Sequence, residues 1–249
     1  MLLKHLSVDC VVFGFIENQL CVLLWQSDIE GTKRLYNEIT TNNDIEVLYQ
    51  QNPMVSDRDY WGLIGSHLPN DQDLDNYAKF ILSKFTGLEK HVYLNQVKTF
   101  GAVQRVPYSR VLTTAYYALI NPAYHAIRKS QMAKDLKWFE ISKLPKLIFD
   151  HEEIIKEALH KLRDEVKYKP VGFHLLPDKF TLTELQTLYE IILDTTLDTR
   201  NFRKKIQNMG LLIDTGERQT NVAHRAAKLY YFNIRIYNKL KEDGLNFRI

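Results

Sequence analysis

The sequence contains few cysteines and no long apolar run, and its first residues do not predict a secretory leader. Cys10 and Cys21 are its only cysteines, and because their spacing matches no metal-binding motif we expect free thiols in a reducing cytoplasm. No apolar run reaches the length that spans a bilayer, and the first residues lack a basic region followed by an apolar run and a small-residue cleavage site. These absences argue against a membrane protein and a disulfide-stapled secreted domain, and they favour a cytoplasmic location.

The composition is that of a globular protein with a basic C-terminal third. The 249 residues are 45% hydrophobic and 25% charged, which suffices for a packed core and for one large domain or two smaller ones. Residues 167–249 hold 14 lysines and arginines against 9 acidic residues, whereas the rest of the chain holds 19 against 21. Basic charge supplies the nonspecific part of affinity for nucleic acid. This excess is modest, so it agrees with a DNA partner without predicting one alone.

Residues 180–210 predict two short helices joined by a tight turn. Thr181 and Glu184 form a capping box, and a stripe of apolar residues at helical spacing follows them. The polar run 194–197 interrupts the stripe. Asp198 can cap a second helix, and Gly210 can end it in the left-handed conformation. The pattern is the outline of a helix-turn-helix.

The second of these helices has a basic face opposite its apolar face, which carries Phe202, Ile206 and Met209. Arginine, glutamine and asparagine can bind base edges in the major groove, whereas lysine suits phosphate. The runs 211–215 and 228–232 then predict two strands around a basic loop, the wing of a winged helix. The alternative is a solvated helix face and an ordinary surface hairpin. The predicted DNA-contacting residues are Thr199, Arg200, Asn201, Arg203, Lys204, Lys205, Gln207, Arg218 and Arg225.

The first 149 residues predict an α/β domain with a mixed sheet. Glu17 and Asn18 offer a hairpin turn, Gly87 can end a helix, and the long polar stretch 26–60 has strand potential only at 45–49. A further helix over 150–166, opened by a capping-box pattern, joins this domain to the winged part. The strands are expected at 8–15, 20–25, 92–100, 111–119 and 137–141, and the helix within 66–88.

Motifs along nearly the whole chain resemble the bacterial Nudix-related transcriptional regulators of the NrtR and AraR type. They include VDCVVFGF at 8–15, WGLIGSHL at 61–68, WFEISKLPKLIFDHEEI at 138–154, VGFHLLPDKFTLTELQTLYE at 171–190 and LDTRNFRKK at 197–205. The resemblance implies a Nudix-like sensing domain over 1–149 and a winged helix-turn-helix domain over 150–249. It also implies a homodimer that binds a double-stranded DNA operator and responds to a small-molecule effector.

The resemblance does not extend to the carboxylates of the Nudix box. When the final glycine of the box is aligned with Gly87, no glutamate stands where the family needs one. Cleavage of a diphosphate needs a divalent cation held by oxygen ligands, which phenylalanine and lysine cannot provide. We therefore expect no metal, no cofactor and no enzymatic activity. The residues at the box positions are Ser66, Gln72, Phe80, Ile81, Lys84 and Phe85.

By the same resemblance, the loop 104–110 lines the pocket or its rim. Arg105, Tyr108 and Arg110 are the predicted effector-binding residues, and the alternative for the arginines is surface solubility. Val106 and Ser109 stand where the family has aspartate and glycine, so the polarity of the pocket differs. The implied effector is a sugar, a sugar phosphate or a compound of the ADP-ribose type.

Two other functions remain open at this point. A divergent Nudix hydrolase could use Asp71, Asp73 and Asp75, although acidic residues at a helix start are more often there for the helix dipole. Alternatively, the winged domain could bind protein in place of DNA.

Overall fold

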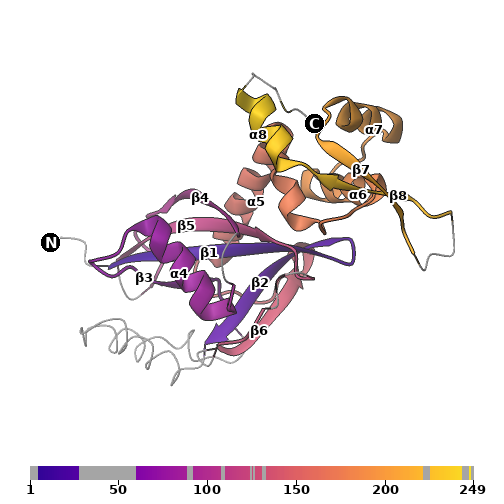
Figure 1. The fold of residues 1–249 in the computed structure, drawn as a ribbon. Coiled ribbons are helices and arrows are strands. Elements are labelled where there is room, and N and C mark those ends of the chain that lie inside the picture. Colours follow the sequence, from indigo (N-terminus) through magenta and orange to yellow (C-terminus); the bar gives the residue numbers. More distant parts are fainter. Residues whose placement is uncertain are drawn as a thin grey trace. The chain divides into compact units, whose positions relative to one another are not determined.

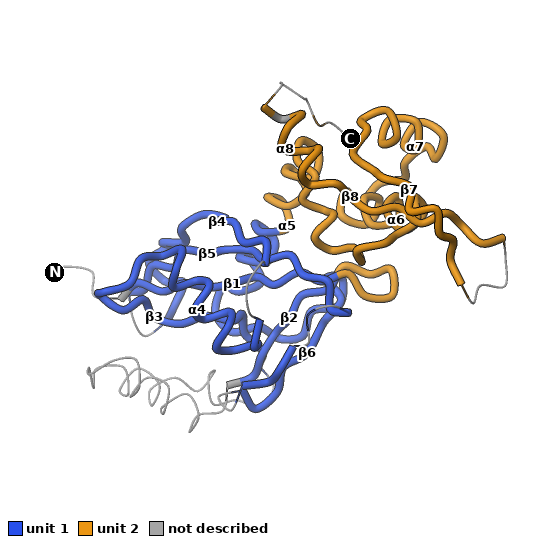
Figure 2. Tube along the Cα trace, viewed as in Figure 1, with its two compact units in different colours: residues 1–14, 21–158 blue, residues 15–20, 159–249 orange. Residues whose placement is uncertain are grey.

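The computed structural model describes residues 5–27, 60–88, 92–107, 110–123, 125, 127–130, 133–220, 225–242 and 247. The strand potential at 45–49 and the predicted effector residue Tyr108 lie outside these residues. The chain divides into two compact units, one of residues 1–14 and 21–158 and the other of residues 15–20 and 159–249 (Figure 2). Within the described residues, no helix is long and apolar enough to cross a membrane.

Unit 1 is built on a mixed six-stranded sheet, as the sequence predicts (Figure 1). Its strands follow the order β4-β5-β1-β2-β6, and β3 also pairs with β1. Strands β1 and β5 run parallel, whereas the β1–β3, β2–β6 and β4–β5 pairs are antiparallel. The strands are β1 His5–Ile16, β2 Gln19–Ser27, β3 Ile64–His67, β4 Tyr93–Phe100, β5 Val111–Ile120 and β6 Ala133–Glu140.

The helix α4, Leu74–Thr86, confirms the helix predicted before Gly87. Asp73 caps its start by accepting the N–H of Asn76, and Gly87 ends it at a φ of 69°. Its apolar stripe lies in a core cluster with the inner side chains of β1, β2, β3 and β5. One helix therefore covers one face of the sheet.

The strand β3 was not predicted, because Ile64–His67 has no β-rich run of its own. Its pairing with β1 places Gly65 opposite Asp9. A Cβ atom at Gly65 would lie 1.9 Å from Oδ1 of Asp9, so only glycine leaves room for that buried carboxylate. The strand forms because of a distant partner.

Unit 2 has the predicted helix-turn-helix followed by a hairpin. The helices α6, Leu182–Leu193, and α7, Thr199–Asn208, precede the antiparallel strands β7, Leu212–Arg218, and β8, Lys228–Phe232. Both bonds of the predicted capping box at Thr181 and Glu184 are present.

Four further elements lie in the described residues, one of them a short 3-10 helix at Ile141–Lys143. The helix α5, His151–Tyr168, confirms the predicted joining helix, and the point at which the two units divide falls inside it, after Ala158. A 3-10 helix, Pro170–Leu175, and the helix α8, Ile234–Glu242, were not predicted. The side-chain oxygen of Asn233 accepts the N–H groups of Arg235 and Ile236 and so opens α8 directly after the wing. The domain boundary at 149/150 stays a prediction.

Candidate nucleic-acid interface

A buried amide fixes the turn between α6 and α7. The side-chain nitrogen of Gln186 lies 3.0 Å from Glu190 Oε1 and 3.1 Å from both the carbonyl oxygen of Leu197 and Thr199 Oγ1. The carboxylate of Glu190 also accepts the N–H of Leu197 at 2.9 Å. The polar groups of the turn are thereby satisfied inside the protein, which sets the direction in which α7 leaves it. The hydroxyl of Thr199, one of the predicted DNA contacts, is part of this network.

The helix α7 buries its apolar side and exposes its basic side. Asp198 caps it by accepting the N–H of Asn201 at 2.8 Å. Phe202 and Ile206 are buried, and the ring of Phe202 lies 6.0 Å from that of Tyr189. The exposed residues of the helix include Thr199, Arg200, Asn201, Lys204, Lys205 and Gln207. Six of the seven predicted contact residues on α7 are therefore at the surface.

Arg203, the seventh, is half-buried and turns toward the wing. Its Nη2 donates to Thr183 Oγ1 at 3.1 Å, whereas its buried Nε has no hydrogen-bond partner among the described residues. A guanidinium group has five donors and cannot lose its charge. The side chain therefore keeps both charge and donors for a ligand at the surface of this unit.

A groove of about 410 Å³ lies between the two helices and the wing, and we call it the reading groove. It brings together four predicted contacts, Arg203, Gln207, Arg218 and Arg225. The sequence did not predict that Lys228 and Tyr230 would also line it. The sequence does contain a signal for this pair: Lys228 and Tyr230 are two residues apart on one strand, and such residues face the same side of it. The remaining lining residues are Leu182, Thr183, Ala226 and Ala227.

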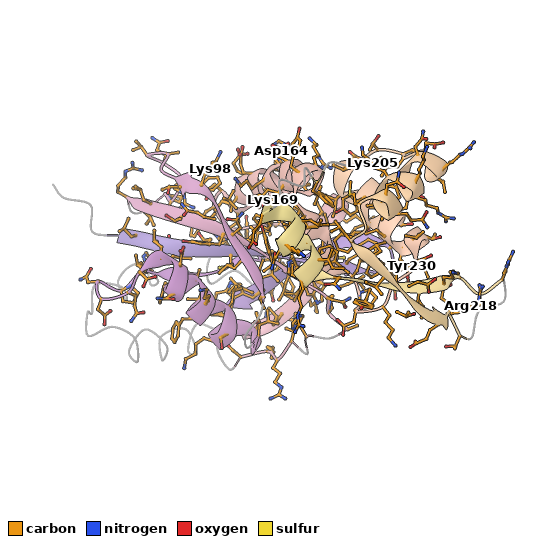
Figure 3. The ribbon with its side chains drawn as sticks, turned by 45° about the horizontal axis from the view of Figure 1, so that its top comes forward. Lys98, Asp164, Lys169, Lys205, Arg218 and Tyr230 are labelled. Atoms are coloured by element: carbon orange, nitrogen blue, oxygen red, sulfur yellow. The ribbon has the colours of Figure 1, made fainter. Side chains whose placement is uncertain are left out.

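The cations around the reading groove differ in how far they are already neutralised. Lys228 pairs with Asp214 at 2.6 Å, and the hydrogen bond between them raises the pKa of Lys228 and lowers that of Asp214. Arg218 donates to the carbonyl oxygen of Ala226 but has no acidic partner among the described residues. Lys205 lies on α7, and Arg218 and Tyr230 lie on the hairpin strands (Figure 3).

The exposed cations of α7 are the ones that remain available to a polyanion. Within the described part of the chain, Arg200, Lys204 and Lys205 form no ion pair, and all three are exposed. Together with the groove they give unit 2 several hydrogen-bond donors on one helix and one hairpin. This arrangement can bind phosphates and base edges of a duplex.

In unit 1, the two described arginines of the loop 104–110 bond to the protein itself. Arg105 is 7% exposed, and its guanidinium donates to both carboxylate oxygens of Asp150, at 2.8 and 2.7 Å, and to Thr113 Oγ1 at 2.8 Å. Arg110 is exposed, and its Nη1 donates to the carbonyl oxygens of Gly101 and Ala102. The effector roles of both arginines stay predictions.

Two titratable groups accompany Arg105. Burial raises the pKa of Asp9 to about 6, although the charge of Arg105 and a hydrogen bond from Thr113 act in the opposite direction. Burial also lowers the pKa of His151 to about 4. Its Nδ1 accepts the N–H of Leu63 at 2.9 Å, as a neutral imidazole can.

Two of the six positions aligned with the Nudix box are occupied by core side chains, and three of the others are exposed. Ile81 and Phe85 are 1% and 3% exposed and lie in the core cluster of unit 1, with the ring of Trp25 4.8 Å from that of Phe85. Phe80 and Lys84 are exposed, and the ammonium of Lys84 lies 5.9 Å from the ring of Phe80. Among the described residues, no group of three or more His, Cys, Asp or Glu side chains is arranged to hold a metal ion.

Known proteins resemble the chain in both parts. The NrtR DNA-binding winged helix domain family matches residues 172–232. A curated protein of Acinetobacter baylyi, the ADPR responsive transcriptional repressor NtrR, is 33% identical over 200 residues, which cover 78% of each chain. Shewanella oneidensis NrtR in complex with a 27mer DNA superposes with a TM-score of 0.73 at 27% identity, covering 94% of this chain and 95% of that one. A MutT/nudix family protein of Enterococcus faecalis, 20% identical, shares the fold with a TM-score of 0.67, covering 94% of this chain and 88% of the other.

Proposed function

This chain belongs to the NrtR family of transcriptional regulators, and from that membership we propose that it is an operator-binding regulator controlled by a metabolite of the ADP-ribose type. The proposal assigns sensing to residues 1–149 and DNA binding to residues 150–249. Operator binding would place the protein in the cytoplasm with the chromosome.

The observation that carries the DNA-binding half is the reading groove beside the exposed face of α7. Arg203, Arg218 and Arg225 line the groove, and Arg200, Lys204 and Lys205 stand outside it without an acidic partner in the described part of the chain. We assign base contacts to the arginines and to Asn201 and Gln207, and phosphate contacts to Lys204, Lys205 and Thr199. A family relative in complex with DNA supports the assignment.

The effector half of the proposal rests on the relative that is described as ADPR responsive. We propose that ADP-ribose, or a compound sharing its diphosphate and ribose groups, meets the loop 104–110 at Tyr108 and Arg110. The guanidinium of Arg105 donates inward to Asp150 and Thr113, so its contribution to effector binding is indirect.

We also propose that the effector is bound and not hydrolysed. The carboxylates nearest the Nudix positions already have structural roles: Asp73 caps α4 and Asp75 accepts the hydroxyl of Tyr116. The positions at Ile81 and Phe85 point into the core. Diphosphate cleavage by a divalent metal would need oxygen ligands that these side chains do not offer.

The test begins with the full-length chain and a DNA duplex that the chain itself selects from a random-sequence pool. Fluorescence anisotropy should show a sequence preference that survives at 0.2 M salt, and saturating ADP-ribose should change the affinity. Binding without any sequence preference would instead favour a protein-binding winged domain.

A parallel assay follows phosphate release from ADP-ribose with magnesium or manganese. Turnover that a chelator abolishes would establish a hydrolase and refute the assignment as a sensor only. For a homodimer, the selected duplex should contain two half-sites related by a twofold axis.

A further inference from the structure

The start of α5 is held by a partly buried ion pair with Arg105, which lies in the loop 104–110. The side chain of Arg105 is 3% exposed, whereas that of Asp150, directly before α5, is 21% exposed. The guanidinium makes the planar two-bond contact that fixes a carboxylate in both position and orientation. We call this Arg105–Asp150 pair the latch.

The latch connects to the sheet as well as to the loop. Arg105 Nη1 donates to Thr113 on β5, and Thr113 also bonds with Ser7 on β1. The buried carboxylate of Asp9, on β1, adds a second negative charge near the guanidinium. Removing one partner of such a set leaves a buried charge without compensation, so a substitution of Arg105 or Asp150 is costly.

The backbone next to the latch is strained. Phe149, one residue before Asp150, has a φ of 49°. A bulky residue in the left-handed region is an outlier that persists only when its surroundings hold it there. Its ring contacts that of His151 at 5.9 Å, and His151 in turn accepts the N–H of Leu63. The segment 149–151 is thus held from outside α5 by the side chain of Arg105, which bonds to Asp150, and by the backbone N–H of Leu63, which bonds to His151.

The two ends of the loop that carries Arg105 are tied together by a second arginine. Arg110 Nη1 donates to the carbonyl oxygens of Gly101 and Ala102 at 2.8 and 2.9 Å. Residues 101 and 110 are therefore bridged by one guanidinium, and Arg105 lies between them. Arg105 therefore lies in one closed loop with Arg110, the residue proposed to meet the effector.

Within unit 2, α5 is attached to the helix-turn-helix by a second arginine. Arg163 Nε donates to the carbonyl oxygen of Ile192 at 2.7 Å, and its Nη2 lies 3.7 Å from Asp194 Oδ2. Asp194 ends α6 and opens the turn that leads to α7. The same helix that begins at the latch thus supports the turn before the DNA-contacting helix.

We propose that Arg105 is a positioning residue, and that the Arg105–Asp150 latch together with the strained residue Phe149 forms the two-state element through which effector binding changes operator affinity. The inference rests on the proposed function and adds the element that links its two halves. In one state the latch is closed and Phe149 is left-handed. In the other the latch is open and Phe149 relaxes.

Two substitutions should bias this element in opposite directions. Arg105→Lys keeps the charge but loses the two-bond geometry, so it favours the open state. Phe149→Asn lowers the penalty of the left-handed conformation, so it favours the closed state. Both should reduce the ADP-ribose effect on operator affinity, which for a coupled site is about 5- to 150-fold, to less than about twofold. Without ADP-ribose, the two variants should shift operator affinity in opposite directions.

The experiment uses the full chain, with operator affinity measured by anisotropy with and without saturating ADP-ribose. ADP-ribose binding, measured by calorimetry, should persist in both variants. Phe149→Leu is the matched control for Phe149→Asn, because it removes the ring but keeps the left-handed penalty. Lys98→Gln is the control for the latch, because Lys98 forms a more exposed ion pair with Glu157 of α5 (Figure 3). Both controls should respond to ADP-ribose as the wild type does.

The outcomes separate the two proposals. A wild-type chain whose operator affinity is unaffected by ADP-ribose refutes the proposed sensing and this inference with it. A responsive wild type whose Arg105→Lys and Phe149→Asn variants respond equally well refutes the latch alone. If Arg105→Lys does not fold, Phe149→Asn decides: a retained response, or a response lost equally in Phe149→Leu, overturns the proposal.

Discussion

Replacing Lys205 tests the assignment of phosphate contacts. The side chain is exposed on α7 and has no ion-pair partner in the described part of the chain, so its full charge is available (Figure 3). Each neutralised phosphate contributes about 0.9 to the slope of log affinity against log salt. In a homodimer, Lys205→Ala removes two contacts and should flatten the slope by about 1.8, which is a loss of about 60-fold in affinity at 0.1 M salt that vanishes near 1 M.

The assay is a salt titration of anisotropy with the selected duplex and with an unrelated duplex of equal length. Because phosphates carry no sequence information, the loss should be equal on both duplexes. Lys79→Ala, which removes an exposed lysine from α4 in unit 1, is the control and should leave the slope unchanged. An unchanged slope in Lys205→Ala, or a loss confined to the selected duplex, would refute the phosphate assignment.

Three further predictions concern specificity and stability. Arg200→Ala should cost about 1–3 kcal/mol on the selected duplex and little on the unrelated one, measured by the same anisotropy assay; an equal loss on both would contradict a base contact. Gly65→Ala forces the Asp9 carboxylate to move and should lower the free energy of unfolding by about 1–3 kcal/mol, measured by urea denaturation. An unchanged urea concentration at the midpoint of unfolding would contradict the tight packing at this position. The pKa of Asp9 is raised to about 6, so the contribution of Asp9 to the free energy of unfolding is lost as pH rises from about 4 to 6. The pKa of His151 is lowered to about 4, so the contribution of His151 is instead lost as pH falls from about 6.5 to 4. Asp9→Asn removes the first effect, so its unfolding free energy should fall by about 2 kcal/mol more than that of the wild type between pH 6.5 and 4; parallel curves would contradict the assigned shifts.

Local signals explain the parts of the fold that the sequence predicted. The capping box of Thr181 and Glu184 and the glycine stop at Gly87 involve residues within one helical turn, so their spacing is visible in the chain. The wing strand Lys228–Phe232 was predicted with its observed bounds, because apolar and aromatic residues dominate it.

The parts that were not predicted depend on partners far along the chain. The strand β3 exists because β1 pairs with it, and Arg105 meets a carboxylate 45 residues away. No spacing rule in a single sequence identifies Asp150 as that partner. For Lys228, the sequence predicted the strand but not the position in the reading groove, because that position depends on the register of the hairpin. Side-chain type and periodicity therefore predicted surfaces better than they predicted pairings.

The burial of Ile81 and Phe85 makes a carboxylate at either position costly to introduce. A glutamate introduced at position 85 would place an ionised carboxylate against Trp25 and the apolar cluster, and it would destabilise the domain before it bound any metal. An oxygen-ligand metal site at these two positions would therefore require the surrounding core residues to change together with them.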